Sequence, residues 1–136
     1  MTKKNYMQET RHVYRTALKA ARKAGGYLLA RFRRDDRIVK SNEKHDVKLD
    51  VDVETENLII NTIRRVFPGH GFLGEEGGGL PGGDGVTREA AGTWIIDPLD
   101  GTVNFAWGIP HFCTSIAFKR GDVLAAGAVF SRSLLA

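Results

Sequence analysis

Residues Thr93 to Thr102 read Thr-Trp-Ile-Ile-Asp-Pro-Leu-Asp-Gly-Thr, an apolar run that leads into an acidic turn. The apolar first half predicts a buried strand, which ends at Asp97 and the proline after it. Because proline fixes the backbone, Asp97 and Asp100 can both face one point. Gly101 and Thr102 would then open a short helix, whose exposed N–H groups can bind phosphate. The Thr102 hydroxyl can orient a water molecule.

Further strands are predicted on either side of this stretch. Residues 70–73 form a short strand candidate. Residues 112–119 and 123–130 read as two strands of a hairpin, with a Gly-Asp turn between them. The glycine-rich residues 74–85 cannot form a regular element, so we expect a mobile loop there.

The first third of the chain predicts one long helix, from about Tyr6 to Phe32, because apolar residues recur there every three or four positions. Lys and Arg fall between them, on the solvent side. Gly25 and Gly26 inside this helix each cost about 1 kcal/mol relative to alanine. That cost indicates either close packing against another element or a kink.

The period changes after this helix. From Asp46 to Val53, apolar residues alternate with charged ones, which is typical of a half-buried strand. Apolar residues return to helical spacing at 58–66, which predicts a second helix. Asp52, before this stretch, is suitably placed as the N-cap of that helix, and Pro68, after it, ends the helix. The sequence therefore predicts an α+β fold, with two helices packed on one face of a mainly antiparallel sheet.

Acidic residues stand at the ends of three predicted strands. Glu75 follows the strand that ends at Leu73, and Asp97 and Asp100 follow the strand that ends at Ile96. Asp52 follows Val51, at the end of the alternating stretch that begins at Asp46. No Lys or Arg lies within five residues of Asp97 or Asp100, so a local ion pair cannot relieve their repulsion. Mg²⁺ prefers such oxygen ligands. Taken singly, each residue also fits a turn, a helix cap or a solvated loop; together they favour phosphate-ester chemistry with a divalent cation.

Two motifs resemble those of a known family. Gly74-Glu75-Glu76-Gly77 and the stretch from Trp94 to Phe105 are similar to the paired motifs of the inositol monophosphatase family. The resemblance also includes 46–52, the helix that ends at Pro68, and 111–130. It implies the N-terminal half of the layered αβαβα sugar-phosphatase fold, with residues 1–136 as a single α+β domain and the family's C-terminal domain absent.

The resemblance also implies an activity, Mg²⁺-dependent hydrolysis of a small phosphate monoester such as inositol monophosphate. By position, Glu75, Asp97 and the Leu99 carbonyl would hold the first Mg²⁺ ion. Asp97 and Asp100 would hold the second.

The remaining roles that the resemblance implies concern water and phosphate. Thr102, together with Glu75 or Asp52, would position the attacking water. The N–H groups of Gly101 and Thr102 would hold the phosphate.

The chain departs from the family pattern in two ways. Leu49 stands where the family commonly has threonine, and the family's further metal-binding aspartate, which follows a tryptophan, is missing. We therefore expect impaired activity from these residues alone. The alternatives are a nucleotide 3′-phosphatase or sugar bisphosphatase of the same superfamily, and a catalytically silent domain that acts by association. In every case we expect self-association, as a homodimer or another assembly.

Composition and charge exclude several classes of protein. With one cysteine there is no disulfide framework, and Cys113 is expected to be a core thiol. No apolar run is long enough for a membrane span, and no secretory signal is evident, so we expect a cytoplasmic protein without a membrane partner. Residues 1–48 hold 14 Lys/Arg and 5 Asp/Glu. We interpret that excess as the solvated face of a helix, and no nucleic-acid partner is expected because the helix lacks stacking aromatics among its charges.

Overall fold

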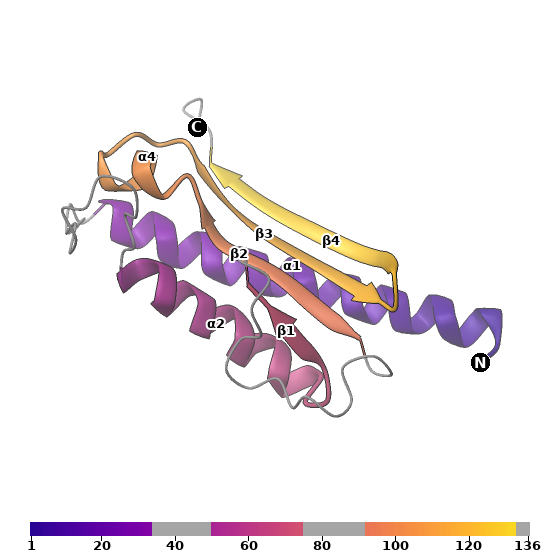
Figure 1. The fold of residues 1–136 in the computed structure, drawn as a ribbon. Coiled ribbons are helices and arrows are strands. Elements are labelled where there is room, and N and C mark those ends of the chain that lie inside the picture. Colours follow the sequence, from indigo (N-terminus) through magenta and orange to yellow (C-terminus); the bar gives the residue numbers. More distant parts are fainter. Residues whose placement is uncertain (34–49, 75–91, 133–136) are drawn as a thin grey trace.

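Two long helices cover one face of a four-stranded sheet in a computed structural model of the chain, which describes residues 1–33, 50–74 and 92–132 (Figure 1). The predicted α+β fold is confirmed. A short helix, α4, follows the second strand. In chain order the elements are α1 (Lys3–Arg33), α2 (Asp50–Val66), β1 (Gly71–Leu73), β2 (Thr93–Asp100), α4 (Thr102–Ala106), β3 (Phe112–Arg120) and β4 (Val123–Arg132).

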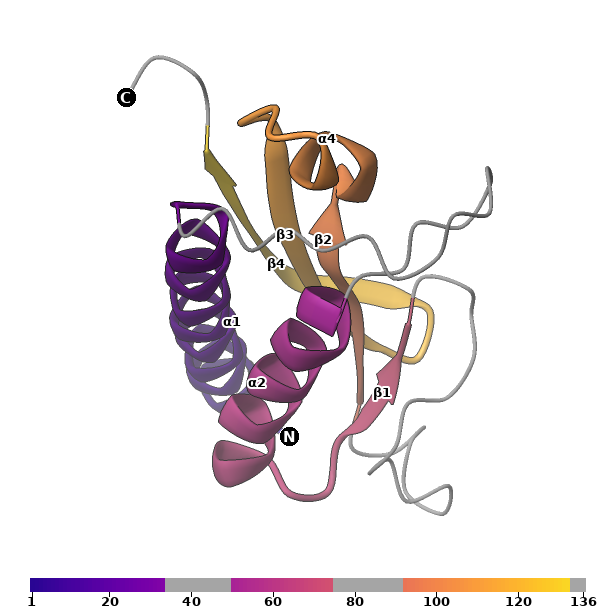
Figure 2. The ribbon, with the colours of Figure 1, turned by 90° about the vertical axis from the view of Figure 1, so that its left-hand side faces the viewer.

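The strands lie in the order β1-β2-β3-β4. β1 is parallel to β2, whereas β2–β3 and β3–β4 are antiparallel, so the sheet is mainly antiparallel as predicted. β3 and β4 form the expected hairpin. Figure 2 shows α1 and α2 side by side on the same side of this sheet.

The strand predicted from Asp46 to Val53 is wrong in its described part, because α2 already begins at Asp50. In a helix Val51 and Thr55 share the buried face while Val53 is 48% exposed, so the alternation in sequence does not mark two faces of a sheet. Asp52 therefore lies within the first turn of α2 and is not its N-cap. Its charge there is favourable, because the N-terminal end of a helix is positive.

The main core lies between the helices and the sheet. Small residues of α1, among them Ala17, Ala20 and Ala24, are fully buried and let the sheet approach closely. Trp94 and Phe118, from β2 and β3, supply the large side chains that fill the space. No described helix is long and apolar enough to cross a membrane.

A second, smaller apolar cluster joins the ends of several elements. Leu28 of α1, Val51 of α2, Leu99 of β2, Phe105 of α4 and Phe112 of β3 pack together there. Each of these side chains is at most 5% exposed. This cluster fixes the start of α2 against the end of β2 and the short helix α4, which are the elements that carry the candidate functional residues.

Candidate functional site

The two aspartates of β2 are placed by a bulge. Asp97 pairs with Ser115 and Asp100 pairs with Cys113, so three steps along β2 match only two along β3. In a regular strand, residues three apart point to opposite faces of the sheet. The extra residue corrects this, so Asp97 and Asp100 share the face that points away from α1 and α2.

The turn after β2 is tight and places Thr102 next to the bulge. Gly101 has a φ of 91°, and a Cβ on it would lie 2.8 Å from the His111 carbonyl oxygen, so only glycine fits without strain. The Thr102 hydroxyl donates a hydrogen bond to the Leu99 carbonyl oxygen at 3.1 Å. The short helix predicted after Asp100 is thus confirmed as α4, with no side-chain cap at its start.

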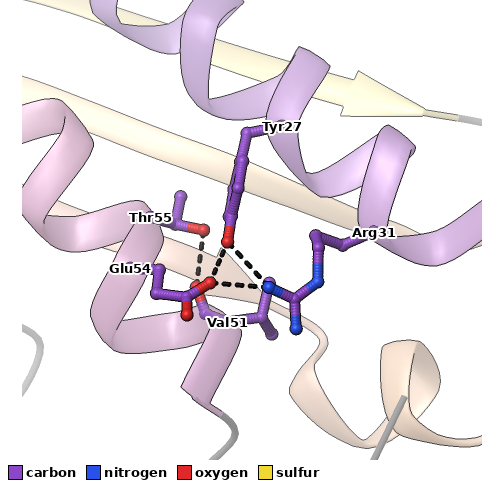
Figure 3. Close-up of polar contacts among 5 residues, drawn as sticks. All are labelled: Tyr27, Arg31, Val51, Glu54 and Thr55. Atoms are coloured by element: carbon purple, nitrogen blue, oxygen red, sulfur yellow. Dashed lines mark hydrogen bonds and ion pairs between the residues drawn. The ribbon is translucent and has the colours of Figure 1, made fainter. Parts of the chain in front are cut away.

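Asp52 lies in the first turn of α2. Contacts of the residues around Asp52, one apolar and one polar, hold this turn in place. Val51, next to Asp52, packs with Leu99 in the smaller apolar cluster. Figure 3 shows the polar contact, in which Glu54 accepts hydrogen bonds from the Tyr27 hydroxyl and the Arg31 guanidinium. The Arg31–Glu54 ion pair spans 2.7 Å and ties the end of α1 to the start of α2.

Cys113 belongs to this site, which the sequence analysis missed. Its thiol is only partly buried, and it donates a hydrogen bond to Asp100 Oδ2 over 3.7 Å. Burial raises the pKa of the thiol, and the charge and hydrogen bond of Asp100 and the charge of Asp97 raise it further. That Cys113 lies beside Asp100 follows from the register of β3 against β2, which the sequence alone does not give.

The predicted ligand Glu75 and the glycine-rich loop lie outside the described residues. β1 ends at Leu73, which pairs with Ile95, two residues before Asp97. Among residues 1–33, 50–74 and 92–132, no three His, Cys, Asp or Glu side chains form a group that could hold a metal ion. The described part places Asp97 and Asp100 on one face of the sheet, and it bonds the Thr102 hydroxyl to the Leu99 carbonyl between them in sequence. A complete ion site depends on a ligand from elsewhere.

Comparison with known proteins shows the family of the chain. The family model described as "Inositol monophosphatase family" matches residues 9–132. The chain belongs to the inositol monophosphatase family.

Relatives and solved structures of this family extend well beyond the present chain. It is 44% identical to the Nus factor SuhB of Pseudomonas aeruginosa and 38% identical to an inositol monophosphatase of Mesembryanthemum crystallinum, over 76% and 85% of its own length. It spans 37% and 42% of those two proteins. The crystal structure of SuhB from Bartonella henselae is 31% identical with a TM-score of 0.73, over 88% of this chain and 45% of that one.

Proposed function

We propose that this inositol-monophosphatase-family chain supplies the metal- and phosphate-binding part of a Mg²⁺-dependent phosphatase that hydrolyses a small phosphate monoester, such as inositol monophosphate. The observation that carries this proposal is the bulge in β2. It sets Asp97 and Asp100 on one face of the sheet, beside the Leu99 carbonyl and the Thr102 hydroxyl.

The residues fit a hard divalent cation. Carboxylate and carbonyl oxygens are the ligands that Mg²⁺ prefers, and the described part offers Asp97, Asp100 and the Leu99 carbonyl around one turn. Glu75, Asp97 and the Leu99 carbonyl would hold one ion, and Asp97 and Asp100 a second. When bound, such ions would lower the pKa of a water molecule, so that it can attack as hydroxide. The ions would also neutralise charge on the phosphoryl oxygens.

The protein groups have their own tasks in this reaction. The Thr102 hydroxyl donates a hydrogen bond to the Leu99 carbonyl oxygen, so the hydroxyl oxygen can still accept a hydrogen bond from a water. Thr102, with Glu75 or Asp52, would orient that water towards phosphorus. The backbone N–H groups of Gly101 and Thr102 would hold the phosphate, since no side chain caps the start of α4.

Replacing Asp97 tests the proposal directly. We predict that Asp97→Asn lowers phosphatase activity and Mg²⁺ binding by about 10²–10³-fold, because a charged ligand is lost. Stability should stay equal or rise, since carboxylate repulsion is relieved. The readouts are a Mg²⁺ titration against inositol monophosphate, a sugar bisphosphate and a nucleotide 3′-phosphate, calorimetric Mg²⁺ binding, and urea unfolding.

Asp122→Asn is the matched control, because Asp122 is exposed in the turn between β3 and β4. It should change neither activity nor Mg²⁺ binding. Equal Mg²⁺ binding by the wild type and Asp97→Asn would exclude the proposed metal site.

A second candidate function is association without catalysis. Relatives named Nus factor favour it, as does the side chain of Trp107, which is 77% exposed. A chain that hydrolyses no ester at any Mg²⁺ concentration, yet sediments as a concentration-dependent oligomer, would support this role. Hydrolysis that Asp97→Asn abolishes would exclude a purely associative one.

A further inference from the structure

Thr114 of β3 lies opposite the bulge that presents the two aspartates. Its neighbours on either side, Cys113 and Ser115, pair with Asp100 and Asp97. Thr114 alone therefore faces two residues of β2, Pro98 and Leu99. A bulge leaves backbone groups that the ladder of hydrogen bonds cannot pair.

The Thr114 hydroxyl supplies the missing partner. It donates a hydrogen bond of 2.9 Å to the Pro98 carbonyl oxygen, and the whole residue is 0% exposed. Phe112 and Ile116, the next residues on the same face of β3, are buried and apolar. A hydroxyl in such surroundings is costly unless it is bonded, so this hydrogen bond is held in place by burial.

We propose that Thr114 is a positioning residue for the metal site: its buried hydroxyl fixes the Pro98 carbonyl and so sets the spacing of Asp97 and Asp100. The inference rests on the proposed function, because it assumes that the two carboxylates bind metal. Thr114 points towards α1 and α2 while the carboxylates point away, so it acts only through the backbone of the bulge.

Metal binding by the unmodified chain and by Thr114→Val tests this inference. Valine keeps the shape of threonine and removes the donor. Mn²⁺ replaces Mg²⁺ as the probe, because the EPR signal of the free ion reports its binding without any turnover. We expect Thr114→Val to weaken Mn²⁺ binding by about tenfold or more, as for other residues that support metal ligands. Thr114→Ser keeps the donor and should retain wild-type affinity.

Ile116→Val is the matched control, because it trims a buried side chain two residues along the same face without touching the bulge. It should lower the urea midpoint and leave the Mn²⁺ affinity unchanged. If Thr114→Val does not fold, Thr114→Ala takes its place and should weaken Mn²⁺ binding in the same way, because alanine also lacks the donor to the Pro98 carbonyl.

The outcomes separate the two proposals. Wild-type Mn²⁺ affinity in Thr114→Val overturns the role of Thr114 and leaves the proposed function intact. Equal loss of affinity in Thr114→Val and Ile116→Val also overturns it, because the effect then follows stability alone. If the unmodified chain binds no Mn²⁺, or Asp97→Asn leaves binding unchanged, the proposed function fails and the role of Thr114 with it.

Discussion

His70 shows how strongly one buried residue constrains the core. Its Nδ1 accepts a hydrogen bond of 2.9 Å from the indole N–H of Trp94, which only an unprotonated nitrogen can do. Its ring stacks on Phe67 with centroids 4.5 Å apart. Burial lowers the pKa of His70 below 6.5, the Arg120 charge lowers it further, and Glu9 partly opposes this.

Stability should therefore depend on pH through His70. Below about pH 6.5 the unfolded chain binds a proton that the folded chain rejects, so the free energy of unfolding falls as the pH drops from 6.5 towards the folded pKa. Urea unfolding at pH 7.5 and 5.5 measures this fall. His70→Gln should reduce it, whereas His111→Gln, at an exposed histidine, should keep it. An equal pH dependence in His70→Gln and wild type would contradict the assignment.

At the scale of elements, two adjacent glycines of α1 have opposite roles. A Cβ on Gly25 would lie 2.1 Å from the Phe130 ring of β4, whereas one on Gly26 meets nothing within 4 Å. Of the two possibilities that the sequence leaves open, close packing and a kink, close packing is present at Gly25 and not at Gly26.

Alanine at each glycine gives a matched pair. We predict that Gly26→Ala raises the free energy of unfolding by up to about 1 kcal/mol through helix propensity. Gly25→Ala should lower it by about 1–3 kcal/mol, because the Phe130 ring must shift in a packed core. Thermal and urea unfolding measure both changes. A stabilising Gly25→Ala would show that α1 does not pack on β4 as described.

The polar contact between α1 and α2 should contribute less to the free energy of unfolding than the packing at Gly25. Tyr27→Phe removes the hydroxyl that donates to Glu54 and accepts from Arg31 at 3.0 Å. We expect a loss of about 0.5–1 kcal/mol in urea unfolding, because the Glu54 side chain is 49% exposed and water weakens the interaction. Tyr14→Phe, at an exposed position of the same helix, is the control and should change stability by less. Equal effects of the two variants would argue against the contact.

These elements show what the sequence could and could not reveal. The long helix and the strands around Trp94 follow local periods, and those predictions are confirmed. The predicted end of the strand at Asp97 and Pro98 is wrong, because β2 continues through the bulge to Asp100. The alternation from Asp46 to Val53 led to a wrong strand prediction. Acidic residues are also favourable in the first turn of a helix, next to its positive N-terminal end, and there they can alternate with apolar residues as in a strand. The bulge was not foreseen, since it arises from the register of β2 against β3. Local sequence does not encode the hydroxyl of Thr114 meeting a carbonyl sixteen residues away.

At the scale of the whole molecule, the two faces of the sheet differ. α1 and α2 lie on the same face of the sheet (Figure 2). The pairing of β2 with β3 puts the two aspartates on the other face, which these two helices leave open. Val129 of β4 pairs with Ser115 and so lies on that same face, where it is 64% exposed. The chain spans about 40% of the length of the curated relatives that it matches. Val129 thus places an exposed apolar side chain on a sheet face that α1 and α2 leave open, and such exposure favours association.

We therefore predict that a polypeptide of these 136 residues self-associates through the open face of its sheet. Sedimentation velocity over a range of concentrations should show a shift from monomer to dimer or larger species. Val129→Lys should move the equilibrium towards the monomer, because a charge resists burial in an apolar contact. Val123→Lys, at the hairpin end where Val123 is 60% exposed, should leave the equilibrium unchanged. Association that survives Val129→Lys but is lost in Val123→Lys would place the contact at the hairpin end, away from the face that carries Asp97 and Asp100.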